Sequence, residues 1–275
     1  MRKRRFVAPA RADVAAAVFA HPIYTGFDGQ LPWLLGHAWP DIDALNAGLH
    51  QNPALHDYRF AAQDRHLLAD GLHYEARIAQ HGVIATRESN WHDLFNACIW
   101  QRYPAIKQAL NARQVTEIAH MGARARNRAQ YALTQFDEAG VIVRVRDAAL
   151  LRLWDRHDWH GLFYRHAGAW HDGTIGIAAV IGHALLEHAL MPEIFVIGKC
   201  LVVLGEADDA HCVHAVADGI AAGELLQDPL HLRPLPLAGI PGWHAEAGRE
   251  AFYREGPCFS PLRAGRRYPA ALPAL

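Results

Sequence analysis

Hydrophobic residues recur at two different spacings along this chain. After Asn90, a spacing of three to four residues places Trp91 and Phe95 on one face, so we predict a helix over 90–102. Asn90 is the expected N-cap of this helix, and Asp93 follows three residues later in an arrangement that resembles a capping box. The same spacing predicts further helices, over 10–20, 41–49, 105–119, 148–154, 159–167, 182–190 and 210–226.

Short apolar runs bounded by turn residues predict strands. The clearest are 174–181 and 195–204. A further strand over 73–78 is expected to return through a tight turn as a hairpin. A second hairpin is expected over 131–145, with its turn at Glu138-Ala139-Gly140.

Helices and strands are mixed without the strict alternation of a doubly wound fold, and no linker divides the chain. We therefore predict a single-domain α+β fold over 1–275, with a mixed or antiparallel sheet and packed helices. A basic segment followed by a helix is expected over 1–20. The chain is rich in Pro and Gly over 228–275, so this C-terminal segment is predicted to be irregular and to wrap the surface.

Composition excludes several classes of protein. The chain has 275 residues, of which 51% are hydrophobic and 20% charged, and its formal net charge is −1. It is therefore globular, and it has no overall field that would attract nucleic acid or an acidic membrane. No apolar run approaches the ~18 residues of a membrane span. The basic segment 1–6 resembles the start of a signal peptide, but the apolar stretch that follows over 14–20 is too short to continue one.

Cysteine and serine usage narrows the chemistry further. None of the four cysteines forms a C-x-x-C pair, which argues against a thiolate zinc site and favours a reduced, cytoplasmic setting. Ser89 and Ser260 are the only serines, and neither has the context of a nucleophile, so a serine hydrolase is nearly excluded.

The segment 90–96 is the most informative stretch, because it places His92, Asp93 and Asn96 at the start of a helix beside large aromatic residues. His92 and Asn96 are four residues apart and share a face. These side chains could hold a metal ion or a polar substrate. The alternative is that Asp93 caps the helix and His92 bonds to backbone.

Two acidic residues, Asp137 and Glu138, come just before Gly140. If they lie at the end of a strand, their oxygens suit a hard cation. The alternative is ordinary turn chemistry, in which acidic residues and glycine are common.

His183, Glu187 and His188 form a pattern close to the inverted zinc-protease motif, but with one residue too many between histidine and glutamate. The two histidines are five residues apart and cannot both reach one ion from the same helix face. His183 and Glu187 can share a face, so this helix is expected to contribute at most two groups. The alternative is a packed helix with a hydrogen-bonded histidine.

Arginines at positions 124, 126 and 128 form a basic segment before the predicted 131–145 hairpin. Guanidinium groups suit phosphate or carboxylate. The alternative is a solvated surface loop, and a nucleic-acid site is the weakest interpretation because no aromatic residue accompanies the arginines.

Several stretches together resemble a bacterial family defined as domain of unknown function 3025. The matching segments are Asn90–Asn96 with Trp100, 107–113, 132–140, 182–187 and 235–243, which occur in the family's order and extend roughly over residues 40–260. The family tends to carry an acidic residue shortly before the 132–134 segment, where this chain has Gln130-Tyr131. The resemblance implies no activity, but it implies that these stretches belong to one fold and converge.

We therefore predict a polar pocket with metal-assisted hydrolysis of a phosphoester or other anionic small molecule. A divalent ion would be held by His92, Asp93, Glu138 and His183. Asp137 or Glu187 would act as the base, and the substrate would be bound by Asn96, Arg124, Arg126 and Arg128. The alternative is a non-enzymatic binding or scaffold protein in which these groups form a buried hydrogen-bond network. The sequence leaves the oligomeric state open.

Overall fold

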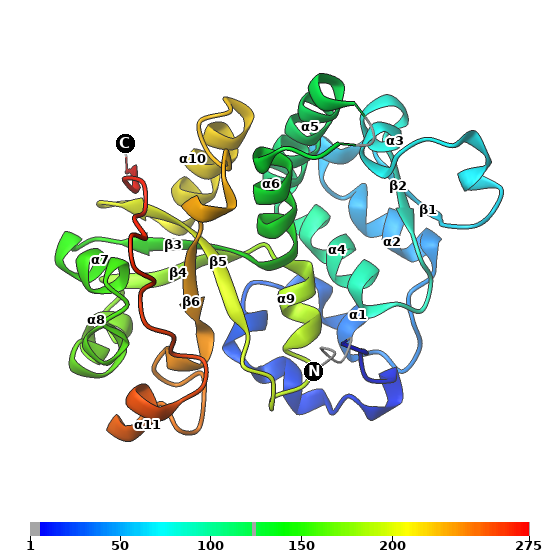
Figure 1. Ribbon diagram of the computed structural model, residues 1–275. Helices are drawn as coiled ribbons and strands as arrows, with labels where there is room; N and C mark the ends of the chain where they lie inside the picture. Colours follow the sequence, from blue (N-terminus) through cyan, green and yellow to red (C-terminus); the bar gives the residue numbers. More distant parts are fainter. Residues whose placement is uncertain (1–5, 123–124, 275) are drawn as a thin grey trace, which may run out of the picture.

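A mixed sheet forms the centre of the computed structural model, which describes residues 6–122 and 125–274 (Figure 1). Its strands run in the order β4-β3-β5-β6, and β7 pairs with the end of β5. β3 is parallel to β5 and antiparallel to β4, while β5 is antiparallel to β6. The strands are β3 (Gly140–Val145), β4 (Ile175–Val180), β5 (Ile197–Leu204), β6 (Arg233–Pro236) and β7 (Leu272–Pro273).

Helices cover this sheet and separate it from a second, smaller one. α6 packs on β3 and β5, α10 packs on β3 and β4, and α7 and α8 lie at one end of the sheet (Figure 1). The α-helices are α1 (Leu31–Leu35), α2 (Ile42–Leu49), α3 (Tyr74–His81), α4 (Trp91–Arg102), α5 (Pro104–Met121), α6 (Arg128–Ala139), α7 (Ala148–Asp155), α8 (Ala167–His171), α9 (His183–His188), α10 (Asp209–Ala221) and α11 (Glu250–Glu255). The small parallel sheet, β1 (Arg59–Ala62) with β2 (Val83–Thr86), lies on the opposite side of α4 from the large sheet (Figure 1).

The central strand explains the continuous apolar run seen in the sequence. Val141, Ile142, Val143 and Val145 are all fully buried, because helices cover both faces of β3. The α+β prediction is confirmed. The helix after Asn90 is also confirmed, since the side chain of Asn90 accepts a hydrogen bond from the backbone N–H of Asp93 at 3.1 Å.

The predicted strand over 73–78 is wrong, since this segment begins α3. The His73 side chain accepts a hydrogen bond from the backbone N–H of Glu75, and Gly82 ends the helix with a φ of +62°. A left-handed residue at this position is a common helix terminator, and it is usually glycine. The helix cap and the terminating glycine therefore decide the conformation of a segment whose hydrophobic pattern is ambiguous.

The predicted hairpin over 131–145 is wrong in its first half. Residues 128–139 form α6, which starts with a capping box in which Asn127 and Gln130 bond to each other's backbone N–H at 2.9 Å. Leu133 and Phe136 are three residues apart and fully buried, which is helical rather than alternating spacing. Asp137 and Glu138 therefore lie in the last turn of a helix and not at the end of a strand.

The two ends of the chain also differ from prediction. Residues 10–20 form two short 3-10 helices without side-chain caps instead of one α-helix. Arg11 fixes this path, because its guanidinium donates to the carbonyl of Gly36 and lies over the rings of Trp39 and Trp91. The basic residues 1–5 lie outside the described part of the chain. In the C-terminal segment, β6 joins the large sheet and Leu235 is fully buried, so this segment does more than wrap the surface.

The structure also bears on two predictions from composition. All four cysteines are buried free thiols. Within residues 6–122 and 125–274, none of the helices has both the length and the apolar character needed to cross a membrane.

Candidate metal centre

A cavity of about 340 Å³ opens between α3, α4, α5 and α6. Most of the side chains that line it are polar or charged, among them Glu75, His92, Asp93, Asn96, Lys107, Asp137, Glu138 and His183. Polar groups at such density are costly to bury unless they bind one another or a ligand. The cavity is therefore the candidate functional site.

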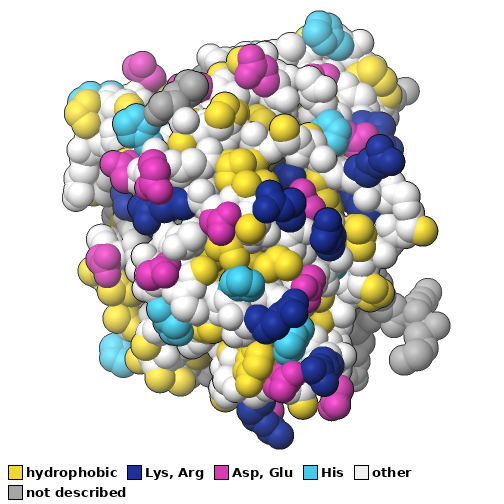
Figure 2. Space-filling view, turned by 90° about the vertical axis from the view of Figure 1, so that its left-hand side faces the viewer, with side chains coloured by type: hydrophobic (Ala, Val, Ile, Leu, Met, Phe, Trp, Pro, Cys, Tyr) yellow, Lys and Arg dark blue, Asp and Glu magenta, His cyan; other side chains and the backbone are white. Residues whose placement is uncertain are grey.

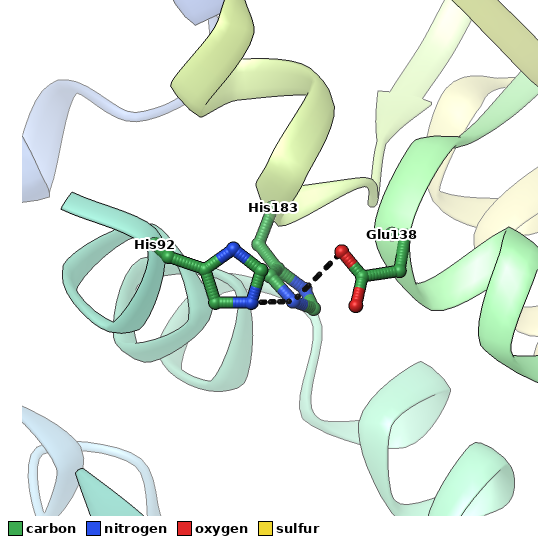
Figure 3. Close-up of side chains that lie close together, drawn as sticks. All are labelled: His92, Glu138 and His183. Carbon is green, nitrogen blue, oxygen red and sulfur yellow. Dashed lines mark hydrogen bonds and ion pairs between the residues drawn. The ribbon is translucent and has the colours of Figure 1, made fainter. Parts of the chain in front are cut away.

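Three potential metal ligands meet at one wall of this cavity. His92 comes from the first turn of α4, Glu138 from the last turn of α6, and His183 is the first residue of α9. One ligand atom from each lies within 4.8 Å of the others. Figure 3 shows the two imidazole rings meeting edge to face, and the angle between their planes is 84°. Nε2 of His92 lies at hydrogen-bond distance, 3.0 Å, from Nε2 of His183, and Glu138 Oε2 lies 3.7 Å from Nε2 of His183.

A close approach of backbones brings Glu138 and His183 together. The carbonyl of Gly140 accepts hydrogen bonds from the backbone N–H groups of Ile181 and Gly182, both at 2.9 Å. A Cβ on Gly182 would collide with the backbone of Ala139. Glycine at this position therefore allows the start of α9 to touch the end of α6, which sets His183 beside Glu138.

Both histidines have a carboxylate behind the ring, on the side away from the meeting point. His92 Nδ1 lies 3.2 Å from Glu187 Oε2, and His183 Nδ1 lies 3.8 Å from Asp137 Oδ2. Asp137 is held in turn by the buried ammonium of Lys107, whose Nζ lies 2.6 Å from Asp137 Oδ1. A carboxylate at Nδ1 orients an imidazole so that the lone pair of Nε2 faces a metal, and metal-binding histidines almost always have such a partner.

The distances suit a small divalent ion. Zinc bonds of about 2.0–2.1 Å in a tetrahedral arrangement place two imidazole nitrogens about 3.3 Å apart, close to the 3.0 Å between the two Nε2 atoms. Two histidines and one carboxylate are also a ligand set that zinc accepts in catalytic sites, where a fourth position is left for water. The residues present therefore fit such an ion.

Charge in the cluster is distributed unevenly between the two rings. Burial acts to lower the pKa of His92, but the hydrogen bond to Glu187 and the charges of Glu138 and Glu187 outweigh it, so its pKa is raised. Burial lowers the pKa of His183 to about 3, so that ring is neutral and its nitrogen can act as a ligand. Burial raises the pKa of Glu138.

Comparison with protein families matches residues 58–263 to the family described as "Protein of unknown function (DUF3025)". The chain belongs to this family. The match includes all three residues of the metal cluster as well as Asp137 and Glu187. No curated protein and no solved structure matches the chain.

In this DUF3025 protein, Asp93 does not join the cluster. Its Oδ2 accepts from the backbone N–H of Arg87 at 2.6 Å, and its Oδ1 accepts from Arg87 Nη2 at 2.7 Å. Both oxygens are therefore engaged in an ion pair that closes the turn before α4. Asn96 does line the cavity, and its Nδ2 donates to the hydroxyl of Tyr74 at 3.1 Å.

The three predicted arginines have different surroundings. Arg126 lines the cavity and is exposed. Arg128 does not line it, since its guanidinium pairs with Asp228, with Nη2 2.7 Å from Oδ1. Arg124 lies outside the described residues.

The cavity residues that the sequence-based prediction did not include are numerous, and Glu75, Lys107 and Asn111 are the most consequential of them. Lys107 is only 4% exposed, and it occurs in one of the stretches that carry the family resemblance. Glu75 was missed because its segment was assigned to a strand. The buried lysine could have been suspected from the sequence, as it lies on the face of α5 that also carries Leu110 and Asn111.

Proposed function

We propose that this protein is a divalent-metal hydrolase, with zinc as the best fit, that acts on a small polar substrate in the 340 Å³ cavity. The proposal rests on one observation: the Nε2 atoms of His92 and His183 converge beside Glu138 while a carboxylate stands at the Nδ1 of each ring. A bound zinc ion lowers the pKa of a coordinated water to about 7 and so supplies hydroxide at neutral pH.

The other roles would be taken by side chains of the protein. His92, His183 and Glu138 would hold the ion, and Glu187 and Asp137 would orient the two rings rather than act as the base. Arg126, exposed at the cavity, would hold an anionic part of the substrate. Asn96 would offer an amide to the substrate from the same wall as His92.

The alternative is a scaffold in which these polar groups only bind one another. Two ion pairs in the cavity favour it, because Arg87 satisfies Asp93 and Lys107 satisfies Asp137. Against it, one ligand atom from each of His92, Glu138 and His183 lies within 4.8 Å of the others, a convergence that suits a shared ion.

Nucleic acid is a weaker candidate partner. Figure 2 shows the face that carries α7 and α8, where Lys and Arg side chains are interspersed with Asp and Glu. That face therefore lacks the basic stripe expected of a nucleic-acid surface. Cytoplasmic location stays a prediction from cysteine usage.

Elemental analysis of untagged protein prepared without chelators tests the proposal. We expect near-stoichiometric zinc or another divalent ion in the wild type, and loss of that ion in His92→Ala and His183→Ala. The matched control is His188→Ala, which removes a histidine from the same helix that lies against Phe6. Hydrolysis of nitrophenyl phosphate and carboxylate esters, measured on the same samples, then tests the activity. A folded wild type without metal after equilibration with zinc would exclude the proposal and favour the scaffold.

A further inference from the structure

Glu75 presents a carboxylate to the same cavity from the first turn of α3. Asn111, which is buried on α5, holds it in place: its Nδ2 donates to Glu75 Oε2 at 2.6 Å and to the Glu75 backbone carbonyl at 3.0 Å. None of the described residues donates a hydrogen bond to Oε1. The side chain is therefore oriented, with one oxygen left for another partner.

This carboxylate differs from Asp93 and Asp137 in having no ion-pair partner at contact distance. Asp93 is paired with Arg87, and Asp137 with Lys107. Within the described part of the chain, Glu75 forms no ion pair with any lysine, arginine or histidine, although the charges of Lys107 and Arg126 act on it from farther away. Burial raises its pKa to about 7, so an ionised Glu75 is held at a cost in stability. A group retained at such a cost is often one that a ligand needs.

A second unused acceptor lies close in the fold. Gln114 follows Asn111 by three residues on α5 and so shares its face of the helix. Its Nε2 donates to Thr134 Oγ1 at 3.2 Å and reaches the carbonyl of Gln130 at 3.5 Å, which directs the amide nitrogen away and leaves Oε1 as a free acceptor among the described residues. Both Gln114 and Glu75 line the cavity. Two side-chain acceptors of the cavity, Glu75 Oε1 and Gln114 Oε1, are therefore without a donor among the described residues.

We infer that Glu75 and Gln114 bind a primary ammonium group of the ligand. An ammonium carries three N–H donors and a positive charge, so it can donate to both free acceptors and place a cation in contact with Glu75, which Lys107 and Arg126 do not do. If the proposed hydrolysis is correct, the substrate class is a small amine whose scissile bond lies at the His92–Glu138–His183 end. The ammonium site itself does not depend on the metal.

Isothermal titration calorimetry at pH 8, where Glu75 is ionised, tests the inference with two probes of matched shape, n-butylammonium chloride and n-butanol. We expect the wild type to bind n-butylammonium at least about 10-fold more tightly than n-butanol, as for a charge-assisted hydrogen bond. Glu75→Gln keeps the acceptor for Asn111 and should remove this preference. Glu255→Gln, an exposed carboxylate on α11 outside the cavity, is the control and should retain it.

Equal binding of the two probes by the wild type, or no binding of either, would overturn the inference without need of a variant. A preference that survives in folded Glu75→Gln would overturn it as well. The titrations are run with and without zinc. Ammonium binding by a protein that takes up no metal would refute the proposed hydrolysis and support the ammonium site. Metal binding without a preference for ammonium would refute the ammonium site and leave the proposed hydrolysis supported.

Discussion

Glu187 Oε2 lies 3.2 Å from Nδ1 of His92, on the opposite side of the ring from the Nε2 that faces His183. A carboxylate at this position would accept from Nδ1–H and leave the lone pair of a neutral ring on Nε2. Glu187→Gln keeps the shape of the side chain but loses the charge that holds this tautomer. We predict a loss of about 10–100-fold in zinc affinity, measured by competition with a chromophoric chelator. Glu193→Gln, an exposed residue just beyond α9, should leave the affinity unchanged; equal affinities for the wild type and Glu187→Gln would show that Glu187 does not orient a ligand.

Asp137 links Lys107 to His183, so its replacement should affect stability and metal binding together. Burial acts to raise the pKa of Asp137, but the charge of Lys107 and the hydrogen bond from its ammonium group outweigh burial and lower the pKa, so the carboxylate is ionised at neutral pH. Asp137→Asn would leave the ammonium of Lys107 buried without its partner. We predict a decrease of about 2–3 kcal/mol in the free energy of unfolding in urea. The double variant Lys107→Met/Asp137→Asn should recover part of that loss; if it does not, the unpaired charge is not the cause.

Glu75 should make stability depend on pH. Its pKa is about 7 in the folded protein and near the ordinary 4.5 when unfolded. At pH values between 4.5 and 7, Glu75 is protonated in the folded state and ionised in the unfolded state. The free energy of unfolding therefore decreases as pH rises through this range. Glu75→Gln cannot ionise, so its free energy of unfolding should not show this decrease. We predict that its free energy of unfolding exceeds that of the wild type by about 1–3 kcal/mol at pH 8 and by much less at pH 4.5, by urea denaturation at each pH. A pH-independent difference would contradict the assignment.

Gly182 allows α9 to approach α6, and Gly182→Ala should separate them. The added methyl group would meet the backbone of Ala139, which has no room to move because the carbonyl of Gly140 is bound by two amides. We predict a loss of about 2 kcal/mol or more in stability together with weaker zinc binding, measured by thermal unfolding with and without zinc. Gly168→Ala, where a methyl group meets no atom within 4 Å, is the matched control. Unchanged zinc affinity in folded Gly182→Ala would mean that the approach does not position His183.

Of the four candidate ligands predicted from the sequence, His92, Glu138 and His183 come together in the structure and Asp93 does not. His92 and His183 were identified because Asn90 caps one helix and a strand leads directly into the other, and both signals are local. Glu138 was identified next to a glycine turn although its segment is a helix. The roles of Glu187 and Asp137 were beyond prediction, because they depend on which side of a ring a carboxylate occupies after distant segments have packed.

The errors have a common physical origin. The segments 73–78 and 131–139 are short, so strand and helix patterns both fit them. Side-chain caps at His73 and Asn127 settle the choice in favour of helices. Glu75 lies in the first of these segments and was not among the predicted pocket residues.

The three candidate ligands come from parts of the chain that are far apart in sequence, and the contact between Gly140 and Gly182 brings two of them together. The ligand set therefore does not exist in the unfolded chain. An ion that binds it would act as a removable cross-link between α4, α6 and α9, closing two long loops. Folding and metal supply would then be coupled, so that the fraction of folded protein in a cell would follow the concentration of the free ion.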